Sequence, residues 1–313
     1  MMSELPLDQV RTLLAVVDEG TFDAAANALR LTPSAVSQRV KALEQRTGRV
    51  LLMRTKPVRP TESGEVVVRF ARQLARLERD ARTALGMSGP GEPTPLSIAV
   101  NSDSLATWFL PALRRVPPEL DLAYELRRED QDHTAALLRE GLVMAAVTSS
   151  PEAVTGCSVR SLGRMRYLPV ASPGFADRWL ERRAGTALRE VIGVAPVISF
   201  DRRDDLQDSF VRRLDPGLRA SARRHLVPTS EGFVSAVAAG MGWGMVPDVH
   251  AEPLLRDGRL VLLTPDHTAD VPLHWQQWKL DSPALATVAE AVAAEAAETL
   301  AGGRPIAPRP LRG

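Results

Sequence analysis

Polar side chains that could contact DNA lie close together near the N-terminus. Ser34, Ser37, Gln38 and Lys41 recur at spacings that place them on one face of a helix, and Thr32 directly precedes that helix. Hydroxyl and amide groups can bond base edges or phosphate oxygens, and a lysine attracts phosphates. A solvated surface helix would show a similar polar face. The surrounding sequence therefore has to decide between the two interpretations.

A basic segment follows this helix. Residues 49–61 read as a short apolar strand, a basic turn and a return strand. The cations of the turn are Arg54, Lys56 and Arg59, and Glu44 is the single acid between residues 30 and 59. Such a patch attracts a polyanion and makes binding dependent on salt. The segment is predicted to form a wing that reaches phosphates beside the helix.

Hydroxyl and acidic side chains in the C-terminal part follow apolar segments or open a helix. Hydroxyls and a helix N-terminus would hold a carboxylate, and acids such as Asp103, Asp204 or Asp205 would hold a cation. The combination indicates an amino acid with a cationic side chain. The predicted effector-binding residues are Ser102, Asp103, Ser104, Thr148, Asp201, Asp205, Ser230 and Glu231. The same residue types are common helix caps and turn formers, so that explanation stays open for each of them.

No constellation of catalytic or metal-binding residues emerges from the sequence. The five histidines have no metal-ligand spacing, and Cys157 has no evident activating base. The glycines of residues 240–244 precede a strand and do not open a helix, so they do not form a dinucleotide fingerprint. The sequence thus favours a protein without enzymatic activity, metal or cofactor.

The elements that position the first group are three short helices. The first is expected over residues 6–19, closed by Gly20, and the second begins after Thr21. Thr32 can cap the third, Pro33 suits its first position, and Gly48 can end it. Together with the wing, this pattern predicts a winged helix-turn-helix domain.

A long helix is predicted over residues 62–85. Its apolar positions alternate spacings of three and four, as in the seam of a coiled coil. The predicted dimerisation residues are Val67, Phe70, Leu74, Leu77 and Ala81. A homodimer would present two recognition helices to a double-stranded DNA site with two-fold symmetry. The alternative is that the seam packs against the chain's own C-terminal domain.

The C-terminal part is predicted to be an α/β domain that follows a Gly/Pro-rich hinge. Its strands alternate with helices, which favours a sheet with ligands at the carboxyl ends of the strands. The expected strands are residues 96–100, 121–127, 142–148, 167–171, 195–200 and 259–264, and the expected helices include 105–116, 132–140 and 231–239.

Bulk properties set outer limits on these predictions. The chain has 313 residues, which suits two or three domains, a formal net charge of +1 and one cysteine. A disulfide framework and a multi-cysteine zinc site are therefore excluded. The N-terminal sequence lacks the layout of a signal peptide and no apolar run could span a bilayer, so a cytoplasmic protein without a membrane partner is expected.

The chain resembles the LysR-type transcriptional regulators over almost its whole length. The resemblance rests on residues 22–54, on Pro60-Thr61-Glu62-Ser63-Gly64, on the long helix and on residues 236–247. Pro60 stands where the family usually has leucine, and Ser63 where it has alanine. Both departures affect only the junction between wing and helix. The resemblance implies an effector domain of two subdomains of periplasmic-binding-protein type II, with the effector between them.

Residues 98–113, 128–141 and 228–237 further resemble the branch that controls basic amino-acid export, the LysG/ArgP type. This implies lysine or arginine as effector, activation of an exporter gene through RNA polymerase, and a homotetramer built from homodimers. The alternatives are a LysR-type regulator sensing another small acid and a cytoplasmic solute-binding α/β protein. The expected boundaries are 1–61 for the DNA-binding domain, 62–86 for the linker helix, 87–95 for the hinge, 96–168 with 270–302 and 169–269 for the two effector subdomains, and 303–313 for a mobile tail.

Overall fold

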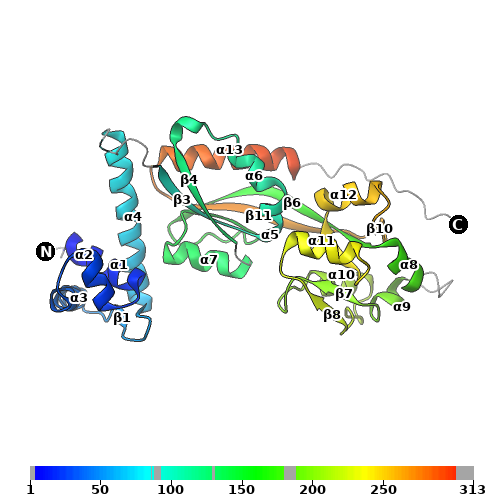
Figure 1. The fold of residues 1–313 in the computed structure, drawn as a ribbon, viewed down its shortest axis with the longest axis horizontal. Helices are drawn as coiled ribbons and strands as arrows, with labels where there is room; N and C mark the ends of the chain where they lie inside the picture. Colours follow the sequence, from blue (N-terminus) through cyan, green and yellow to red (C-terminus); the bar gives the residue numbers. More distant parts are fainter. Residues whose placement is uncertain (1–3, 86, 88–92, 129–130, 180–187, 301–313) are drawn as a thin grey trace.

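The computed structural model describes residues 4–85, 87, 93–128, 131–179 and 188–300 of the chain. The predicted mobile tail, residues 303–313, and most of the predicted hinge lie outside these residues. The molecule is elongated (Figure 1), with the N-terminal helices at one end, a long helix beside them, and a two-lobed C-terminal domain beyond. The predicted winged helix-turn-helix followed by an α/β domain is confirmed.

The N-terminal domain consists of three helices and a small wing. They are α1 (Leu7–Glu19), α2 (Phe22–Leu29), α3 (Pro33–Thr47), β1 (Leu52–Met53) and β2 (Arg59–Pro60). The predicted caps form: the hydroxyl of Thr32 accepts the N–H of Ala35 at 3.2 Å, and Gly48 ends α3 with a φ of 65°. Val36, Val40 and Leu43 are buried against α1 and α2, so the opposite face of α3 is left to solvent.

Glu44, the lone acid of the basic segment, has a structural role. Its Oε1 accepts the backbone N–H of Leu51 at 2.8 Å and that of Leu52 at 3.4 Å. The carboxylate thus ties the end of α3 to the start of the wing. Gly64 allows the next helix to cross this wing closely, since an added Cβ would lie 1.9 Å from the carbonyl oxygen of Leu51.

The long helix α4 (Glu62–Ala84) stands between the N-terminal domain and the rest of the molecule (Figure 1). One side of it carries exposed apolar residues: Val66 is 55% exposed, Phe70 39% and Leu77 42%. Leu74 is half-buried and Ala81 is exposed. Val67 does not belong to this stripe, because it is buried in the N-terminal core. The predicted seam therefore starts at Val66 and not at Val67.

The other side of α4 is fastened to the C-terminal domain by two arginines. Arg76 is 5% exposed and donates to the carbonyl of Pro95 at 2.8 Å and to the hydroxyl of Ser282 at 3.4 Å. Arg72 donates to the carbonyl of Glu140 and to Asp18 of α1. The helix thus contacts its own C-terminal domain through these arginines, whereas the alternative expectation had the apolar seam in that contact, and the apolar stripe stays exposed.

The C-terminal domain is built on a sheet that is seven-stranded in the described part of the chain, in the order β10-β6-β11-β5-β3-β4, with β9 pairing with β6. Strand β3 runs parallel to β4 and β5, whereas β6 and β11 are long antiparallel partners. The strands of this sheet are β3 (Thr94–Val100), β4 (Leu122–Arg128), β5 (Ala145–Thr148), β6 (Cys157–Ala171), β9 (Gly244–Pro247), β10 (Val261–Leu262) and β11 (Ala269–Trp278).

The helices divide this domain into two lobes (Figure 1). Lobe I contains β3, β4 and β5 with α5 (Ser102–Ser104), the π-helical turn η1 (Leu105–Phe109), α6 (Leu110–Leu113), η2 (Pro118–Leu120), α7 (Gln131–Glu140) and α13 (Pro283–Thr299). Lobe II contains β9, β10 and the small parallel sheet of β7 (Val197–Ser199) and β8 (Arg224–Leu226), with α8 (Pro173–Trp179), α9 (Leu188–Ile192), α10 (Leu206–Leu214), α11 (Ser230–Ala238) and α12 (Asp248–Arg256). Strands β6 and β11 connect the lobes.

The connecting strands differ most from the sequence-based expectation. Only residues 167–171 of β6 were predicted, and β11 was not predicted as a strand. In the missed part of β6, the exposed Arg160 and Arg164 and the half-buried Arg166 alternate with buried residues, and β11 contains Pro272 and two glutamines. Each strand has one face toward solvent along this stretch, so neither forms the continuous apolar run that identifies a fully buried strand.

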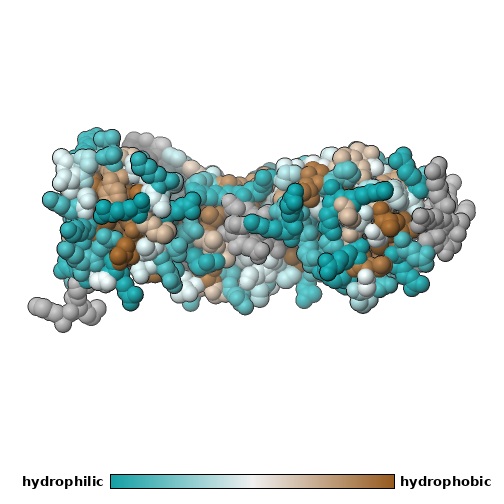
Figure 2. All heavy atoms as spheres, turned by 90° about the horizontal axis from the view of Figure 1, so that it is seen from below, coloured by the Kyte–Doolittle hydropathy of each residue, from teal (hydrophilic) through white to brown (hydrophobic). Residues whose placement is uncertain are grey.

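The face of the molecule drawn in Figure 2 is mostly hydrophilic, with scattered hydrophobic patches. No helix within the described residues combines the length and the apolar character that a membrane crossing requires. The described residues also contain no group of three or more histidine, cysteine or acidic side chains arranged to hold a metal ion.

Candidate functional site

The outer face of α3 presents the predicted polar residues together. Thr32, Ser34, Gln38 and Lys41 are exposed, and Ser37 is half-buried. These side chains share one face because the apolar positions of α3 are fixed against the domain core. They leave a helix surface with hydroxyl, amide and ammonium groups and no acid among them, which suits the major groove of DNA.

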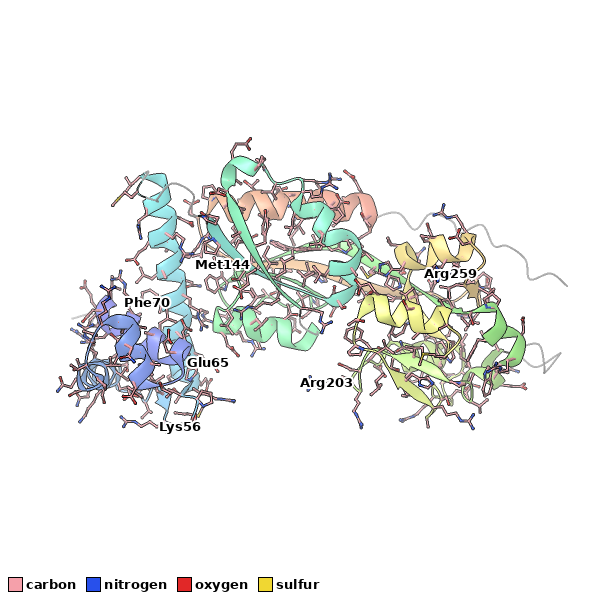
Figure 3. All side chains as sticks on the ribbon, viewed as in Figure 1. Lys56, Glu65, Phe70, Met144, Arg203 and Arg259 are labelled. Carbon is pink, nitrogen blue, oxygen red and sulfur yellow. The ribbon has the colours of Figure 1, made fainter. Side chains whose placement is uncertain are left out.

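The wing places its cations beside this helix. Arg54, Lys56 and Arg59 are exposed, and Lys56 projects from the edge of the N-terminal domain (Figure 3). The guanidinium of Arg54 lies 5.9 Å from the ring centroid of Phe22, which holds it against α2. The exposed polar face of α3 and the exposed cations of the wing therefore belong to one domain.

A second site is a cavity of about 390 Å³ between the two lobes. Lobe I contributes Asn101, Ser102 and Asp103, at the carboxyl end of β3. The remaining lining residues come from β6, lobe II and β11 and are Tyr167, Phe200, Asp201, Arg203, Asp204, Asp205, Leu206, Gln207, Ser209, Ser230, Phe233, Val234, Met245, Pro247 and Val271. This is where ligands bind in open α/β sheets.

Asp103 connects the two sides of the cavity. Its Oδ1 accepts the hydroxyl of Ser230 from lobe II at 2.6 Å, and its Oδ2 accepts the phenol of Tyr167 at 2.7 Å. Burial, and then the charge of Asp103, raise the pKa of Tyr167, so the phenol keeps the proton that it donates. The backbone N–H of Ser230 donates to Ser102 Oγ at 3.3 Å. One carboxylate and one hydroxyl of lobe I thus hold the first turn of α11.

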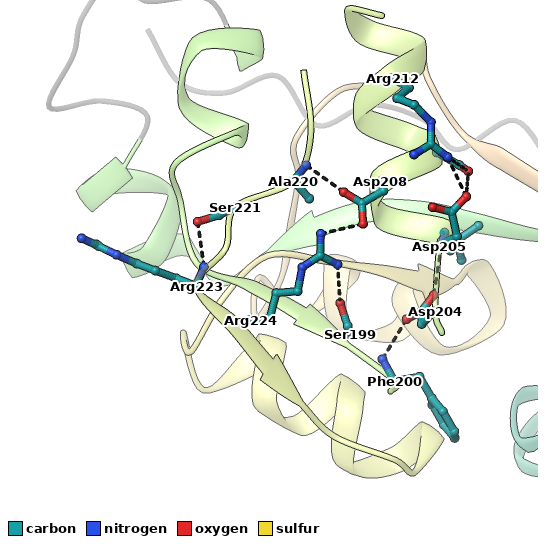
Figure 4. A network of polar contacts seen from close by, with 12 residues as sticks. Ser199, Phe200, Asp204, Asp205, Asp208, Arg212, Ala220, Ser221, Arg223 and Arg224 are labelled. Atoms are coloured by element: carbon teal, nitrogen blue, oxygen red, sulfur yellow. Dashed lines mark hydrogen bonds and ion pairs between the residues drawn. The ribbon is translucent and has the colours of Figure 1, made fainter. Parts of the chain in front are cut away.

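The acids of lobe II differ from one another in their surroundings. Asp201 accepts the N–H groups of Arg203 and Asp204, as a turn former does. Asp205 is exposed and pairs with Arg212 at 2.6 Å (Figure 4), which lowers the pKa of its carboxyl. Asp204 is half-buried and accepts the N–H of Phe200 at 2.7 Å and that of Leu206 at 3.1 Å. Burial nevertheless raises the pKa of Asp204.

Five of the eight predicted effector-binding residues meet at this cavity, namely Ser102, Asp103, Asp201, Asp205 and Ser230. The other three do not line it. Ser104 is fully buried in the helix that follows β3, and Thr148 is buried at the end of β5, where it accepts the N–H of Ser150. Glu231 is exposed on the first turn of α11. Residues one or two positions apart on a helix point in different directions, and here Ser102 and Ser230 face the cavity whereas Ser104 and Glu231 do not.

Tyr167, Gln207 and Phe200 also line the cavity but were not among the predicted binding residues. Tyr167 follows an unrecognised part of β6, and only the pairing of β6 with β11 and β9 brings it beside Asp103. Gln207 and Phe200 have no local signal at all. Asn101, whose Oδ1 accepts the N–H of Ser104 at 2.9 Å, was visible as a polar residue at a strand end.

Comparison with known proteins identifies the two parts of the chain. Residues 7–65 match the model of the bacterial regulatory helix-turn-helix protein, LysR family, and residues 91–297 match the LysR substrate binding domain. The chain belongs to the LysR family. It is therefore a DNA-binding transcriptional regulator whose N-terminal domain carries the helix-turn-helix and whose lobes form the substrate-binding domain.

Similar proteins cover nearly the whole chain. The HTH-type transcriptional regulator LysG of Mycobacterium tuberculosis is 47% identical over 92% of this chain and 92% of its own length. The lysine export transcriptional regulatory protein LysG of Corynebacterium glutamicum is 42% identical over 93% of this chain and 98% of its own. A full-length structure of Corynebacterium glutamicum LysG with the effector Arg bound has a TM-score of 0.81 and 41% identity, and the match covers 94% of this chain and 99% of that one.

Proposed function

We propose that this regulator binds lysine or arginine in the cavity between its lobes and thereby controls transcription of a basic amino-acid exporter gene. The observation that carries the proposal is the charge of the lining. Asp103, Asp201, Asp204 and Asp205 line the cavity, whereas Arg203 is the one basic residue among the described residues that do so. A cationic amino acid compensates this excess of negative charge.

The polar groups of the cavity also suit the other end of an amino acid. Ser102 and the first turn of α11 offer hydroxyl and N–H groups for an α-carboxylate. Asp103 offers oxygens for an α-ammonium. The bound arginine of the Corynebacterium glutamicum relative and its role in lysine export support the same ligand class.

On DNA, Ser34, Ser37 and Gln38 would contact base edges, while Thr32, Lys41 and the cations of the wing would contact the backbone. The exposed stripe of Val66, Phe70 and Leu77 on α4 supports a homodimer, since it offers apolar area to a second copy. A dimer reads a site with two-fold symmetry, and two dimers would form a tetramer. The protein would act in the cytoplasm and affect RNA polymerase without catalysing a reaction itself.

A ligand can shift such a regulator only if it binds two arrangements with different affinity. The lobes touch at Asp103–Ser230 and where Arg128 donates to the carbonyl of Pro228 at 3.1 Å. A ligand placed between them changes how these contacts pack, and α4 transmits the change through Arg72 and Arg76 to α1. The N-terminal domains of the assembly would then move relative to each other.

Calorimetric titration of the full-length protein with lysine, arginine and leucine tests the effector. We expect binding of at least one basic amino acid and none of leucine. A protein that binds neither basic amino acid is not a basic amino-acid sensor, although it remains a LysR regulator. A gel shift with the DNA upstream of its own gene and of candidate exporter genes tests the target, and a specific, salt-sensitive complex is expected.

A further inference from the structure

The first turn of α10 contains a buried polar atom that no contact in the described structure explains. Gln207 is 1% exposed and lines the cavity from α10. Its amide bonds to the carboxylate of Asp204, so the amide nitrogen donates and the oxygen remains as an acceptor. No described group donates to this Oε1. A buried acceptor without a donor is costly, and such atoms are rare in folded proteins.

Another buried glutamine shows how such a side chain is normally accommodated. Gln276 is also 1% exposed, but its Oε1 accepts the N–H of Val154 at 3.0 Å and its amide nitrogen donates to the carbonyls of Ser150 and Glu152. Gln276 does not line the cavity. Gln9 of α1 also has an unpartnered buried Oε1, but it lies in the N-terminal domain, so Gln207 is the described glutamine at the cavity whose acceptor is left over.

Asp204 adds an uncompensated charge beside this acceptor. Its oxygens accept two backbone N–H groups and the amide of Gln207, yet Asp204 has no ion pair among the described residues. The adjacent acid, Asp205, points to Arg212 instead (Figure 4). Holding the turn between β7 and α10 explains the backbone contacts of Asp204, but it explains neither the missing cation nor the missing donor at Gln207.

Asp103, the other well-placed acid, is less available for a distal cation. Both of its oxygens already accept short hydrogen bonds, from Ser230 and from Tyr167. It also lies across the cavity in lobe I, next to the hydroxyl and N–H groups that suit an amino-acid head group. The two ends of a basic amino acid thus find different partners in the two lobes.

We infer that Asp204 and Gln207 form the receptor for the cationic end of the effector side chain, with Gln207 Oε1 accepting one of its N–H groups. This inference rests on the proposed basic effector. A guanidinium or an ammonium supplies both the positive charge that Asp204 lacks and the donor that Gln207 lacks. The α-amino and α-carboxylate groups then lie toward Asp103, Ser102 and α11.

The test is calorimetric titration of the full-length protein with arginine. Gln207→Met keeps the size of the side chain but removes the acceptor, and it should weaken arginine binding about tenfold. Asp204→Asn should weaken it at least as much, about tenfold or more. The matched control is Asp177→Asn, which removes an exposed carboxylate of the same lobe that does not line the cavity, and it should change the affinity less than about twofold.

The midpoint of thermal unfolding without ligand separates a binding role from a structural one. Gln207→Met removes both the unsatisfied oxygen and the N–H donated to Asp204, two changes that oppose each other in stability, so its unliganded midpoint should stay close to that of the wild type while its arginine affinity falls. Wild-type affinity in Gln207→Met, or a loss of affinity only in step with a lower unliganded midpoint, would overturn the inference. If the wild type binds neither arginine nor lysine, the proposed effector itself is wrong.

Discussion

The DNA-facing surface and the effector cavity are assembled in different ways. The polar face of α3 and the cations of the wing come from one continuous segment, residues 32–59, and nearly all of them are exposed. The cavity takes its lining from the end of β3, from β6, from the turn before α10, from α11 and from β11. Its key groups are buried or half-buried, and several are hydrogen-bonded to one another. The first site depends on local folding, and the second depends on the correct pairing of strands far apart in the sequence.

This difference sets how mutations should act. An exposed residue of α3 can change without disturbing its neighbours, so its loss should be confined to one contact with DNA. A residue of the cavity can contact both lobes and the ligand. Its substitution should therefore reduce effector affinity more than an α3 substitution reduces DNA affinity, and it should also disturb the neighbouring contacts.

The largest effect is expected at Asp103. Asp103→Ala removes the carboxylate that joins Tyr167 and Ser230 and that faces the ligand, so arginine affinity should fall by about 100-fold or more. Calorimetry measures the affinity, and the spectrum of unliganded protein by circular dichroism confirms folding. If the folded variant binds arginine within a factor of three of the wild-type affinity, Asp103 is not an effector-binding residue.

The next largest effect is expected at Arg76, which links α4 to the C-terminal domain. Arg76→Met replaces a guanidinium that is 5% exposed and bonded to Asp80, Pro95 and Ser282. Breaking such a buried contact should destabilise the protein by about 2 to 3 kcal/mol, because the partners lose a charged donor. Urea unfolding measures the change. Arg79→Met, on the exposed part of the same helix, is the control and should shift stability by less than about 0.5 kcal/mol.

On the DNA side, two substitutions should have different signatures. Gln38→Ala should weaken binding to the operator about tenfold while leaving random DNA unaffected, because it removes a base contact. Lys56→Ala should weaken binding to every sequence and reduce the salt slope by about one. Competition gel shifts at several salt concentrations measure both. Equal losses on operator and random DNA for both variants would contradict this division of roles.

The smallest effect is a pH dependence of effector binding. Burial raises the pKa of Asp204, so its carboxyl takes up a proton at a higher pH than an ordinary aspartate. A cationic ligand needs the ionised form, and Asp103 is the other acid that acts on this carboxyl. Affinity for arginine should therefore be highest at neutral pH and should fall over the acidic range below it, as the pH is lowered through the raised pKa of Asp204. A rise over that range would contradict the assignment.

The same contrast explains what the sequence could predict. The caps Thr32 and Gly48 and the apolar spacing of α3 act within a few residues, so the helix and its polar face followed from the sequence. The register of the apolar stripe on α4 did not follow from the sequence. Val66, Val67 and Val68 are consecutive, and either of the first two could begin the seam. Spacing alone cannot decide which of them the N-terminal core buries.

In the cavity, residues at the ends of recognisable strands were found, and those that need tertiary pairing were not. Asp103 follows β3 directly, and Ser230 opens a helix. Tyr167 lies beside the cavity because β6 pairs with β11, and the arginines in that part of β6 hid the strand from prediction. Gln207 resembles any polar residue in the first turn of a helix. Ser104, Thr148 and Glu231 had suitable chemistry next to the right places but point elsewhere.

The most direct test of the account compares arginine with citrulline, its uncharged analogue of nearly the same shape, in calorimetric titrations of the wild-type protein. If the acids of the cavity bind the effector through its positive side chain, arginine should bind at least about 100-fold more tightly than citrulline. Equal affinity for the two would show that the cavity reads shape and not charge, and would contradict the proposed basic effector.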